Sequence, residues 1–375
     1  RDPFGIKQVY YTEGSFGFAF ASEPQALVAA GLVKPAVRDE AAAELLQLQF
    51  TTGPHTMFEG IHRVLPGETL VIEAGRIARR HRIEALPDGG PEDIDDAEAL
   101  KRLDAALLDS VAVHQRSDVP YGMFLSGGID SAVVLSLMAR LNDRPVRAYT
   151  VGFPGTAAAD ERAHAGAVAT SVGAEHVEIS FGEGDFWRLL PAVAAAMDDP
   201  VADYAELPTW RLAEVAAREL KVILSGDGGD ELFGGYGRYR AVMRPWWKYR
   251  RAMRAHGALE GLGILRDETR EWRRGLSASE SVAAHPGRTR LQVAQATDCA
   301  DWLAHDLLVK VDRCLMAHGV EGRTPLLDPV VAQAVFRLPD RLKVHGRVGK
   351  WILRQWLAER IPVAEPFARK RGFTV

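Results

Sequence analysis

The chain has 375 residues and a formal net charge of −4, and 47% of its residues are hydrophobic while 26% are charged. These values are ordinary for a globular protein, and they exclude a mini-protein, a disordered chain and a polybasic nucleic-acid binder. The chain has two cysteines without a CxxC pair and no apolar run near the roughly 18 residues of a membrane span, and its first residues lack the charged start and apolar centre of a signal peptide. We therefore expect a reduced, cytoplasmic protein that binds neither membrane nor nucleic acid.

The first part of the chain, residues 1–86, is predicted to be β-rich. Short strand-like runs separated by Gly and Pro occur at residues 9–12, 15–21, 68–73 and 77–83, and one helix is predicted at 40–50. Residues 87–96 are rich in Pro, Gly and Asp and are predicted to be a linker. The chain opens on Arg1 rather than Met and stops at Val375 without a helix end, so we expect both ends to be truncated.

The second part, residues 97–375, alternates strands and helices. Strands are predicted at residues 121–125, 146–152, 176–181 and 222–225, with helices at 131–141 and 160–172, and a mainly helical remainder after residue 234. Parallel strands joined by helices predict an α/β fold with a doubly wound parallel sheet. Because ligands of such sheets bind at the carboxyl ends of the strands, the residues just after 125, 150 and 224 are the first candidates for a site.

A glycine loop, Ser126-Gly127-Gly128-Ile129-Asp130-Ser131, lies directly between a predicted strand and a predicted helix. Two glycines allow a tight turn with exposed N–H groups, and the start of the helix adds positive partial charge, which suits a pyrophosphate. The loop lacks the GxxxxGK[ST] pattern of the Walker loop. Asp130 beside a phosphate requires a cation between them, and Mg²⁺ is the usual one. The structural alternative is a plain strand-to-helix turn in which Asp130 stabilises the helix start.

A second glycine loop, Ser225-Gly226-Asp227-Gly228-Gly229-Asp230-Glu231, follows the predicted strand at 222–225. Acidic residues among glycines at the carboxyl end of a strand indicate a polar or cationic ligand. Asp227 and Asp230 are three residues apart, so one turn can direct both side chains toward one small site. Taken alone, this loop is equally consistent with an ordinary turn at a sheet edge, and its pairing with the first loop favours function.

Motifs along nearly the whole chain resemble a known family. In order they are SGGIDS, VGF at Val151, LSGDGGDELFGGYGRY, DLLVKVDRCLMAHGVEGRTPLLD, LPDRLKV, GKWILR and RKRGF, and they resemble the synthetase domain of the glutamine-dependent asparagine synthetase family. The segments RDPFGIKQVYY, ASEPQALV and FEGIHRVLPGETL resemble the later half of its glutaminase domain, although KQVYY stands where the family usually has KPLYY. The resemblance implies a synthetase domain of the PP-loop ATP pyrophosphatase type, preceded by the β-rich remnant of an N-terminal-nucleophile glutaminase domain.

The resemblance also implies roles for individual residues. The pyrophosphate loop would be formed by Ser126, Gly127, Gly128 and Ser131, joined by Ser225 of the second loop. The adenine pocket would be lined by Phe124, Val151 and Gly226, and Mg²⁺ on the ATP phosphates would be held by Asp130 and Asp230. Lys350 would stabilise charge on the reacting phosphate, a role that suits a compact ammonium group. Asp227 would accept a proton from the attacking amine, although the bacterial pattern has Glu at this position. Asp2 would belong to the glutamine-binding wall.

The function implied by the resemblance is an ATP-dependent carbon–nitrogen ligase of the glutamine-hydrolysing asparagine synthase type. It would adenylate a carboxylate, aspartate by default, release pyrophosphate and transfer ammonia, as in asparagine biosynthesis. A different carboxylate, such as a peptide, glycan or secondary-metabolite precursor, stays open, and so does a homodimer. An RNA-modifying enzyme and a nucleotide-binding module without turnover are the alternatives, and the net charge and the retained carboxylates argue against them. We also expect this chain not to hydrolyse glutamine, because its first cysteine is Cys299.

Overall fold

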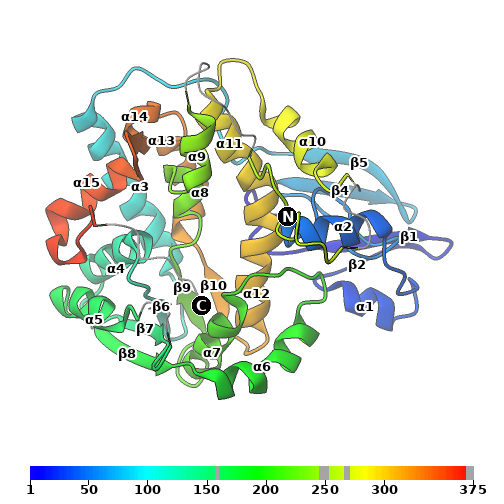
Figure 1. The fold of residues 1–375 in the computed structure, drawn as a ribbon, viewed down its shortest axis with the longest axis horizontal. Helices are drawn as coiled ribbons and strands as arrows, with labels where there is room; N and C mark the ends of the chain where they lie inside the picture. Colours follow the sequence, from blue (N-terminus) through cyan, green and yellow to red (C-terminus); the bar gives the residue numbers. More distant parts are fainter. Residues whose placement is uncertain (157–159, 245–252, 266–270, 369–375) are drawn as a thin grey trace. The chain divides into compact units, whose positions relative to one another are not determined.

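A computed structural model describes residues 1–156, 160–244, 253–265 and 271–368 of the chain (Figure 1). These residues form two compact units. The first contains Arg1–Gly90, Met197–Asp203 and the described part of Arg238–Lys310, and the second contains Pro91–Ala196, Tyr204–Gly237 and the described residues from Val311 onward. The RKRGF motif, residues 369–373, lies outside the described residues. The sequence domains 1–86 and 97–375 remain predictions, because the two units are defined by contacts rather than by function.

The first unit is built on two small antiparallel sheets. One has the strand order β2-β1-β3 and the other pairs β4 with β5. The sequence predicted strands at the positions of β1, β2, β4 and β5, but not β3 or the pairing of the strands. The elements of this unit are β1 (Tyr10–Gly14), β2 (Gly17–Ala21), α1 (Pro24–Ala29), α2 (Asp39–Leu48), β3 (His62–Arg63), β4 (Glu68–Glu73), β5 (Arg76–Arg82), α10 (Arg274–Ala283), α11 (Arg290–Asp298) and the π-helix η1 (Cys299–Leu307).

The prediction of one helix in residues 1–86 was wrong, because α1 precedes the predicted α2. Helix α1 has only six residues and begins at Pro24, so it is too short to show a helical period. Tertiary packing explains its presence, since Leu27 is buried against Tyr10 and Ile61.

A buried ion pair joins the segment Met197–Asp203 to the sheets of the first unit. The Arg63 guanidinium donates to both carboxylate oxygens of Asp199, at 2.6 and 2.8 Å, and these two side chains are 2% and 1% exposed. The hydroxyl of Tyr10 donates to the same carboxylate at 2.9 Å. Such a pair is stable in the interior only when its hydrogen-bonding groups are satisfied, and Arg63 also donates to the backbone carbonyls of Thr51 and His55.

The second unit is built on a five-stranded parallel sheet with the order β10-β9-β6-β7-β8. The strands are β6 (Tyr121–Phe124), β7 (Arg147–Gly152), β8 (Glu175–Ser180), β9 (Val222–Leu224) and β10 (Glu321–Arg323). The main helices are α3 (Asp96–His114), α4 (Ile129–Leu141), α5 (Arg162–Ser171), α6 (Glu183–Ala196), α7 (Glu206–Ala216), α8 (Gly229–Phe233), α13 (Pro329–Val335), α14 (Asp340–Lys343) and α15 (Trp351–Arg360).

Shorter elements complete the second unit. They are the 3₁₀ turns η2 (Pro325–Leu327) and η3 (Pro362–Ala364) and the two-residue strands β11 (Val344–His345) and β12 (Val348–Gly349), which pair with each other. Two further helices, α9 (Gly237–Val242) and α12 (Leu308–Met316), contain residues of both units.

The topology of the sheet confirms the predicted doubly wound α/β fold. From β6 the chain steps through α4 to β7 and through α5 to β8, and then returns through α6 and α7 to β9 on the other side of β6. Helices α5 and α7 both pack on β7, as expected when helices cover both faces of the sheet (Figure 1). The direction of the crossovers therefore reverses between β6 and β9, and the crevice at the carboxyl ends of these two strands is where such folds bind ligands.

Candidate active site

The loop after β6 is closed by its own two serines. The Ser131 hydroxyl accepts from the N–H of Ser126 at 3.2 Å and lies 3.1 Å from the carbonyl oxygens of Ser126 and Gly128. The Ser126 hydroxyl accepts from the N–H of Gly128 at 3.1 Å. The N–H of Gly127 donates to the carboxylate of Glu161 at 2.9 Å. We expected these N–H groups to be exposed, but both already have side-chain acceptors, so the loop is held in shape by the protein itself.

The loop after β9 depends on a glycine with a left-handed backbone. Gly228 has a φ of +89°, and a Cβ added there would lie 2.2 Å from the Leu327 side chain. Only glycine fits this conformation without strain. Ser225 is buried and donates its hydroxyl to the Asp227 carboxylate at 2.6 Å. The loop therefore presents Asp227 and then Asp230 as the chain turns into α8.

The two glycine loops are in direct contact. A Cβ added to Gly226 would lie 2.7 Å from the N atom of Ser131, and one added to Gly229 would lie 2.3 Å from the Asp130 carboxylate. Parallel pairing of β6 with β9 brings the loops to the same edge of the sheet. The contact explains why the second loop is rich in glycine, since a side chain at Gly226 would displace the backbone of the first loop and one at Gly229 would displace the Asp130 carboxylate.

Lys350 joins the two loops through its ammonium group. Its Nζ pairs with Asp130 of the first loop and lies 2.8 Å from Asp230 of the second. The lysine is 4% exposed and has a φ of +56° directly before α15. Burial acts to lower the pKa of Lys350, but the charges of Asp130 and Asp230 and their hydrogen bonds outweigh it, so the pKa is raised and the ammonium stays charged.

A glycine also gives the charged cluster its space. A Cβ on Gly235 would lie 1.9 Å from the Asp230 carboxylate and 2.3 Å from the Lys350 side chain. Glycine is therefore the only residue type at position 235 that leaves room for both side chains. The cluster of Asp130, Asp230 and Lys350 brings together three segments that are far apart in the sequence.

The structure brings most of the predicted site residues to neighbouring strand ends. Phe124 ends β6, Val151 lies next to the end of β7, and Gly226 follows β9. Val151 is 7% exposed, so its side chain is mainly part of the core. Asp2 belongs to the first unit, where its carboxylate accepts from the N–H groups of Ile6 and Lys7 at 2.9 and 3.0 Å and stabilises a turn.

A small cavity of about 70 Å³ lies beside the first loop. It is lined by Gly127, Gly128, Ile129, Asp130, His164, Gly235, Lys350, Arg354, Ala364, Glu365, Pro366 and Ala368. The sequence analysis did not single out His164, Arg354 or the neighbouring Glu161. Arg354 lies within the GKWILR motif, and Glu161 and His164 follow β7, whose carboxyl end the sequence analysis had singled out. These were the available signals.

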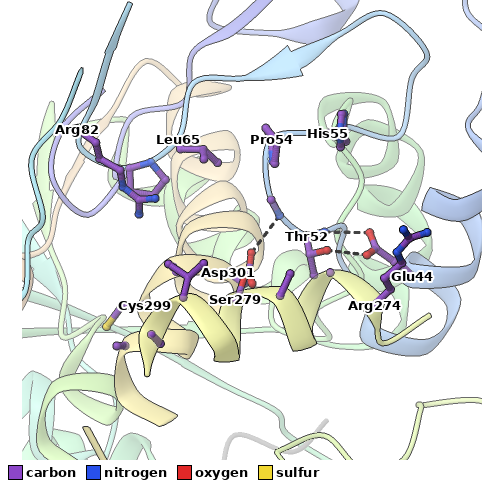
Figure 2. A pocket seen from close by; sticks show the side chains of 18 of the residues that line it. Glu44, Thr52, Pro54, His55, Leu65, Arg82, Arg274, Ser279, Cys299 and Asp301 are labelled. Atoms are coloured by element: carbon purple, nitrogen blue, oxygen red, sulfur yellow. Dashed lines mark hydrogen bonds between the residues drawn. The ribbon is translucent and has the colours of Figure 1, made fainter. Parts of the chain in front are cut away.

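A much larger cavity of about 890 Å³ lies within the first unit (Figure 2). One wall carries two acids, of which Asp301 is buried and Glu44 is partly buried. Glu44 accepts from the N–H and hydroxyl of Thr52 at 3.1 and 2.6 Å, and Asp301 accepts from the N–H of Gly53 at 3.0 Å. Burial raises the pKa of Glu44 and raises that of Asp301 to about 6. Pro3 and Phe4, which follow Asp2 in the sequence, also line this cavity.

Neither a metal-binding cluster of three side chains nor a membrane-spanning helix is found among the described residues. Among the described residues, no group of three or more His, Cys, Asp or Glu side chains is arranged to hold a metal ion. Across the same part of the chain, none of the helices has both the length and the apolar character needed to cross a membrane.

Comparison with known proteins gives two family matches. Residues 102–375 match the asparagine synthase family, and residues 1–82 match a glutamine amidotransferase domain. The asparagine synthase match covers the sheet, both glycine loops and Lys350.

Individual relatives agree with these matches. Asparagine synthetase (glutamine-hydrolyzing) 1 of Bacillus subtilis is 30% identical over 415 residues, which cover 100% of this chain and 65% of the relative. A Mycobacterium bovis protein that carries the asparagine synthetase (glutamine-hydrolyzing) name provisionally is 32% identical over 421 residues, with 100% of this chain and 64% of its own length covered. The chain thus spans slightly less than two thirds of these relatives.

A solved structure gives a weaker likeness. The NMN synthetase of Francisella tularensis covers 38% of this chain and 58% of its own, with 22% identity and a TM-score of 0.27. A likeness at this level supports no inference about the site.

Proposed function

The chain belongs to the asparagine synthase family, and from this premise we propose that the two glycine loops of the second unit form the site of an ATP-dependent amide ligase. The proposed reaction is adenylation of a carboxylate, with aspartate as the default substrate, followed by transfer of ammonia. The observation that carries the proposal is the convergence of Asp130, Asp230 and Lys350 at the switch point between β6 and β9.

The ATP phosphates would lie against the first loop and the start of α4. The helix begins at Ile129, so its first N–H groups and its dipole favour an anion there. Ser126, Gly127, Gly128 and Ser131 would shape this surface. The adenine would lie between the ends of β6, β7 and β9, where Phe124, Val151 and Gly226 are placed, beside Ser225.

Mg²⁺ would be held by Asp130 and Asp230. Their carboxylates face one cation, the Lys350 ammonium, so the geometry suits a positive charge at this point. Two carboxylates with further oxygens from phosphates and water are the usual environment of Mg²⁺ in ATP sites. When bound, the ion would neutralise phosphate charge and favour departure of pyrophosphate.

Lys350 and Asp227 have separate proposed roles in the two half-reactions. In the first, a substrate carboxylate oxygen attacks the α-phosphorus of ATP, the α–β phosphoanhydride bond breaks and pyrophosphate leaves, while Lys350 stabilises the phosphate charge. In the second, ammonia attacks the acyl carbon, and AMP leaves with the oxygen that it gained. The proton lost from nitrogen passes to Asp227, which lies in the loop that also carries Asp230.

The β-rich residues 1–86 are proposed to be the C-terminal part of a glutaminase domain that supplies the ammonia from glutamine. The glutamine amidotransferase match at residues 1–82 supports this proposal, and Asp2 would contribute to the glutamine-binding wall. Residues 87–96 would be the linker, and residues 97–375 the synthetase domain. A cytoplasmic location and a homodimer rest on the sequence alone and stay predictions.

One experiment distinguishes the proposed function from two alternatives. The substrate could be another carboxylate, and the site could bind a nucleotide without turning it over. Incubation of the chain with ATP, Mg²⁺, an ammonium salt and a panel of carboxylic acids, read by pyrophosphate release, separates these cases. Release that depends on aspartate supports the default substrate, and release with another acid identifies that acid. Nucleotide binding without any release would reject the ligase.

A further inference from the structure

A buried glutamate, Glu161, forms a hydrogen bond with the backbone of the first glycine loop. Glu161 precedes α5, is 8% exposed, and accepts from the N–H of Gly127 at 2.9 Å. A Cβ added to Gly127 would lie 3.0 to 3.3 Å from the Cδ, Cβ and Cγ atoms of Glu161. The whole side chain of the glutamate therefore packs along the glycine, and its carboxylate accepts the N–H of Gly127.

Glu161 contacts Gly127 but does not line the cavity beside the loop. The cavity of about 70 Å³ is lined by Gly127 and its neighbours up to Asp130, and by His164, which is one turn further along α5. Glu161 is not among the lining residues. Its carboxylate thus acts on the loop without occupying the space beside it.

We propose that Glu161 is a positioning residue for the phosphates of the bound nucleotide, and this inference rests on the proposed ATP site. By accepting the Gly127 N–H, the carboxylate fixes the peptide bond between Ser126 and Gly127. Ser126 adjoins this peptide bond, and its side-chain hydroxyl accepts from the N–H of Gly128 at the start of α4. A loop that is held in shape before the ligand arrives loses less conformational freedom on binding.

If Glu161 competed with the nucleotide for the loop, its removal would change ATP affinity in the opposite direction. A carboxylate on a loop N–H resembles a phosphate oxygen, so Glu161 could instead be displaced when a nucleotide binds. Its removal would then strengthen ATP binding, because a competing anion would be gone. The positioning role predicts that removal weakens ATP binding, because the loop is no longer held in shape and loses more conformational freedom when ATP binds.

The test is a comparison of Glu161→Ala and Glu161→Gln by calorimetric titration with ATP and Mg²⁺, with thermal unfolding measured without nucleotide. Asp160→Asn is the matched control, since this neighbouring exposed carboxylate pairs with Arg162. We expect Glu161→Ala to weaken ATP binding about 10-fold or more. Glu161→Gln keeps an oxygen acceptor and should stay within about 3-fold of the wild type, as should Asp160→Asn.

Steady-state kinetics separate positioning from a loss of fold. Glu161→Ala should raise the KM for ATP and leave the KM for the carboxylate substrate unchanged. Unchanged or tighter ATP binding by Glu161→Ala would overturn the proposal, and so would a loss in Glu161→Gln as large as that in Glu161→Ala. If Glu161→Ala does not fold, Glu161→Gln still tests the proposal, because ATP binding by Glu161→Gln that is either tighter or more than about 3-fold weaker than that of the wild type would overturn it. A wild-type chain that fails to bind ATP would reject the proposed function instead.

Discussion

Lys350 donates a hydrogen bond of 2.8 Å to Asp230, although the two residues belong to different segments of the second unit. The same ammonium also pairs with Asp130. Each carboxylate therefore shares one cation with a partner on the neighbouring loop. The arrangement concentrates two negative charges at the point where the proposed reaction needs a metal ion and a polyphosphate.

Replacing either carboxylate should stop the first half-reaction. Asp130→Asn and Asp230→Asn each remove one oxygen ligand and one negative charge, and the amide that remains binds Mg²⁺ poorly. We expect pyrophosphate release to be abolished in both variants, with circular dichroism unchanged. The assay is pyrophosphate release across a Mg²⁺ titration. Near wild-type turnover at saturating Mg²⁺ in either variant would show that this residue is not a ligand.

Adding one methyl group at Gly229 should disturb the same cluster. The Cβ of Gly229→Ala would lie 2.3 Å from the Asp130 carboxylate, which must then move away from its position beside Lys350. We expect pyrophosphate release to fall at least about 10-fold, while the melting temperature changes little, because a flexible side-chain end can yield. Gly184→Ala is the matched control, since no atom lies within 4 Å of its added Cβ. Equal activity in the two variants would contradict the proposed role of Asp130.

Asp301 should make the stability of the protein fall as the pH rises. Burial raises its folded-state pKa to about 6, above the 3.8 of an unperturbed group, so the folded state binds more protons between these values. The free energy of unfolding therefore decreases across this window. Asp301→Asn should remove this dependence and gain about 2–3 kcal/mol at pH 7 to 8 relative to the wild type.

The quantity to compare is the difference in free energy of unfolding between Asp301→Asn and the wild type, because a second buried group also titrates. Burial lowers the pKa of His305 well below its ordinary value, and this contribution is lost as the pH falls, which gives the opposite slope. Subtraction alone does not remove it, because Nε2 of His305 lies 3.9 Å from Oδ1 of Asp301 and the substitution changes the surroundings of the imidazole. The comparison is therefore decided above pH 7, where His305 is neutral in both proteins. Denaturant unfolding from pH 4 to 8 is the measurement, with the exposed Asp143→Asn as control. A variant that is less stable than the wild type at pH 8 would contradict the raised pKa.

Asp227 should affect only the second half-reaction. If it accepts the proton of the attacking ammonia, Asp227→Asn should preserve carboxylate-dependent ATP–pyrophosphate exchange and slow amide formation by about 10² to 10⁴. Asp227→Glu keeps the carboxylate and should retain amide formation. If Asp227 merely stabilises its turn with the Ser225 hydroxyl, both half-reactions should fall together in Asp227→Asn. Parallel loss would therefore reject the base.

The sequence predicted those features that depend on local patterns. The β-rich start, the alternation of strands and helices, and the position of each glycine loop at the end of a strand all follow from the period of apolar residues and the position of glycine. The pairing of Asp130 and Asp230 with Lys350 could be anticipated only through the family resemblance. Their meeting point depends on the order of the strands, which periodicity does not report.

Other features were beyond the reach of local patterns. Strand β10 is the sequence Glu-Gly-Arg and becomes a strand because it pairs with β9. Glu161 falls at the start of the helix predicted at 160–172 and looks like an ordinary polar residue there, and its contact with Gly127 requires the packing of β7 beside β6. Helix α1 was missed for its short length. In each case a tertiary contact, rather than local preference, decides the outcome.

The most direct test of the central claim is the fate of a carboxylate oxygen. The chain is incubated with ATP, Mg²⁺, an ammonium salt and aspartate labelled with ¹⁸O in its side-chain carboxylate, and the products are examined by ³¹P NMR. Adenylation transfers one labelled oxygen to the α-phosphorus, so the account predicts ¹⁸O in AMP together with unlabelled pyrophosphate. Label in inorganic phosphate, with ADP as the nucleotide product, would contradict it.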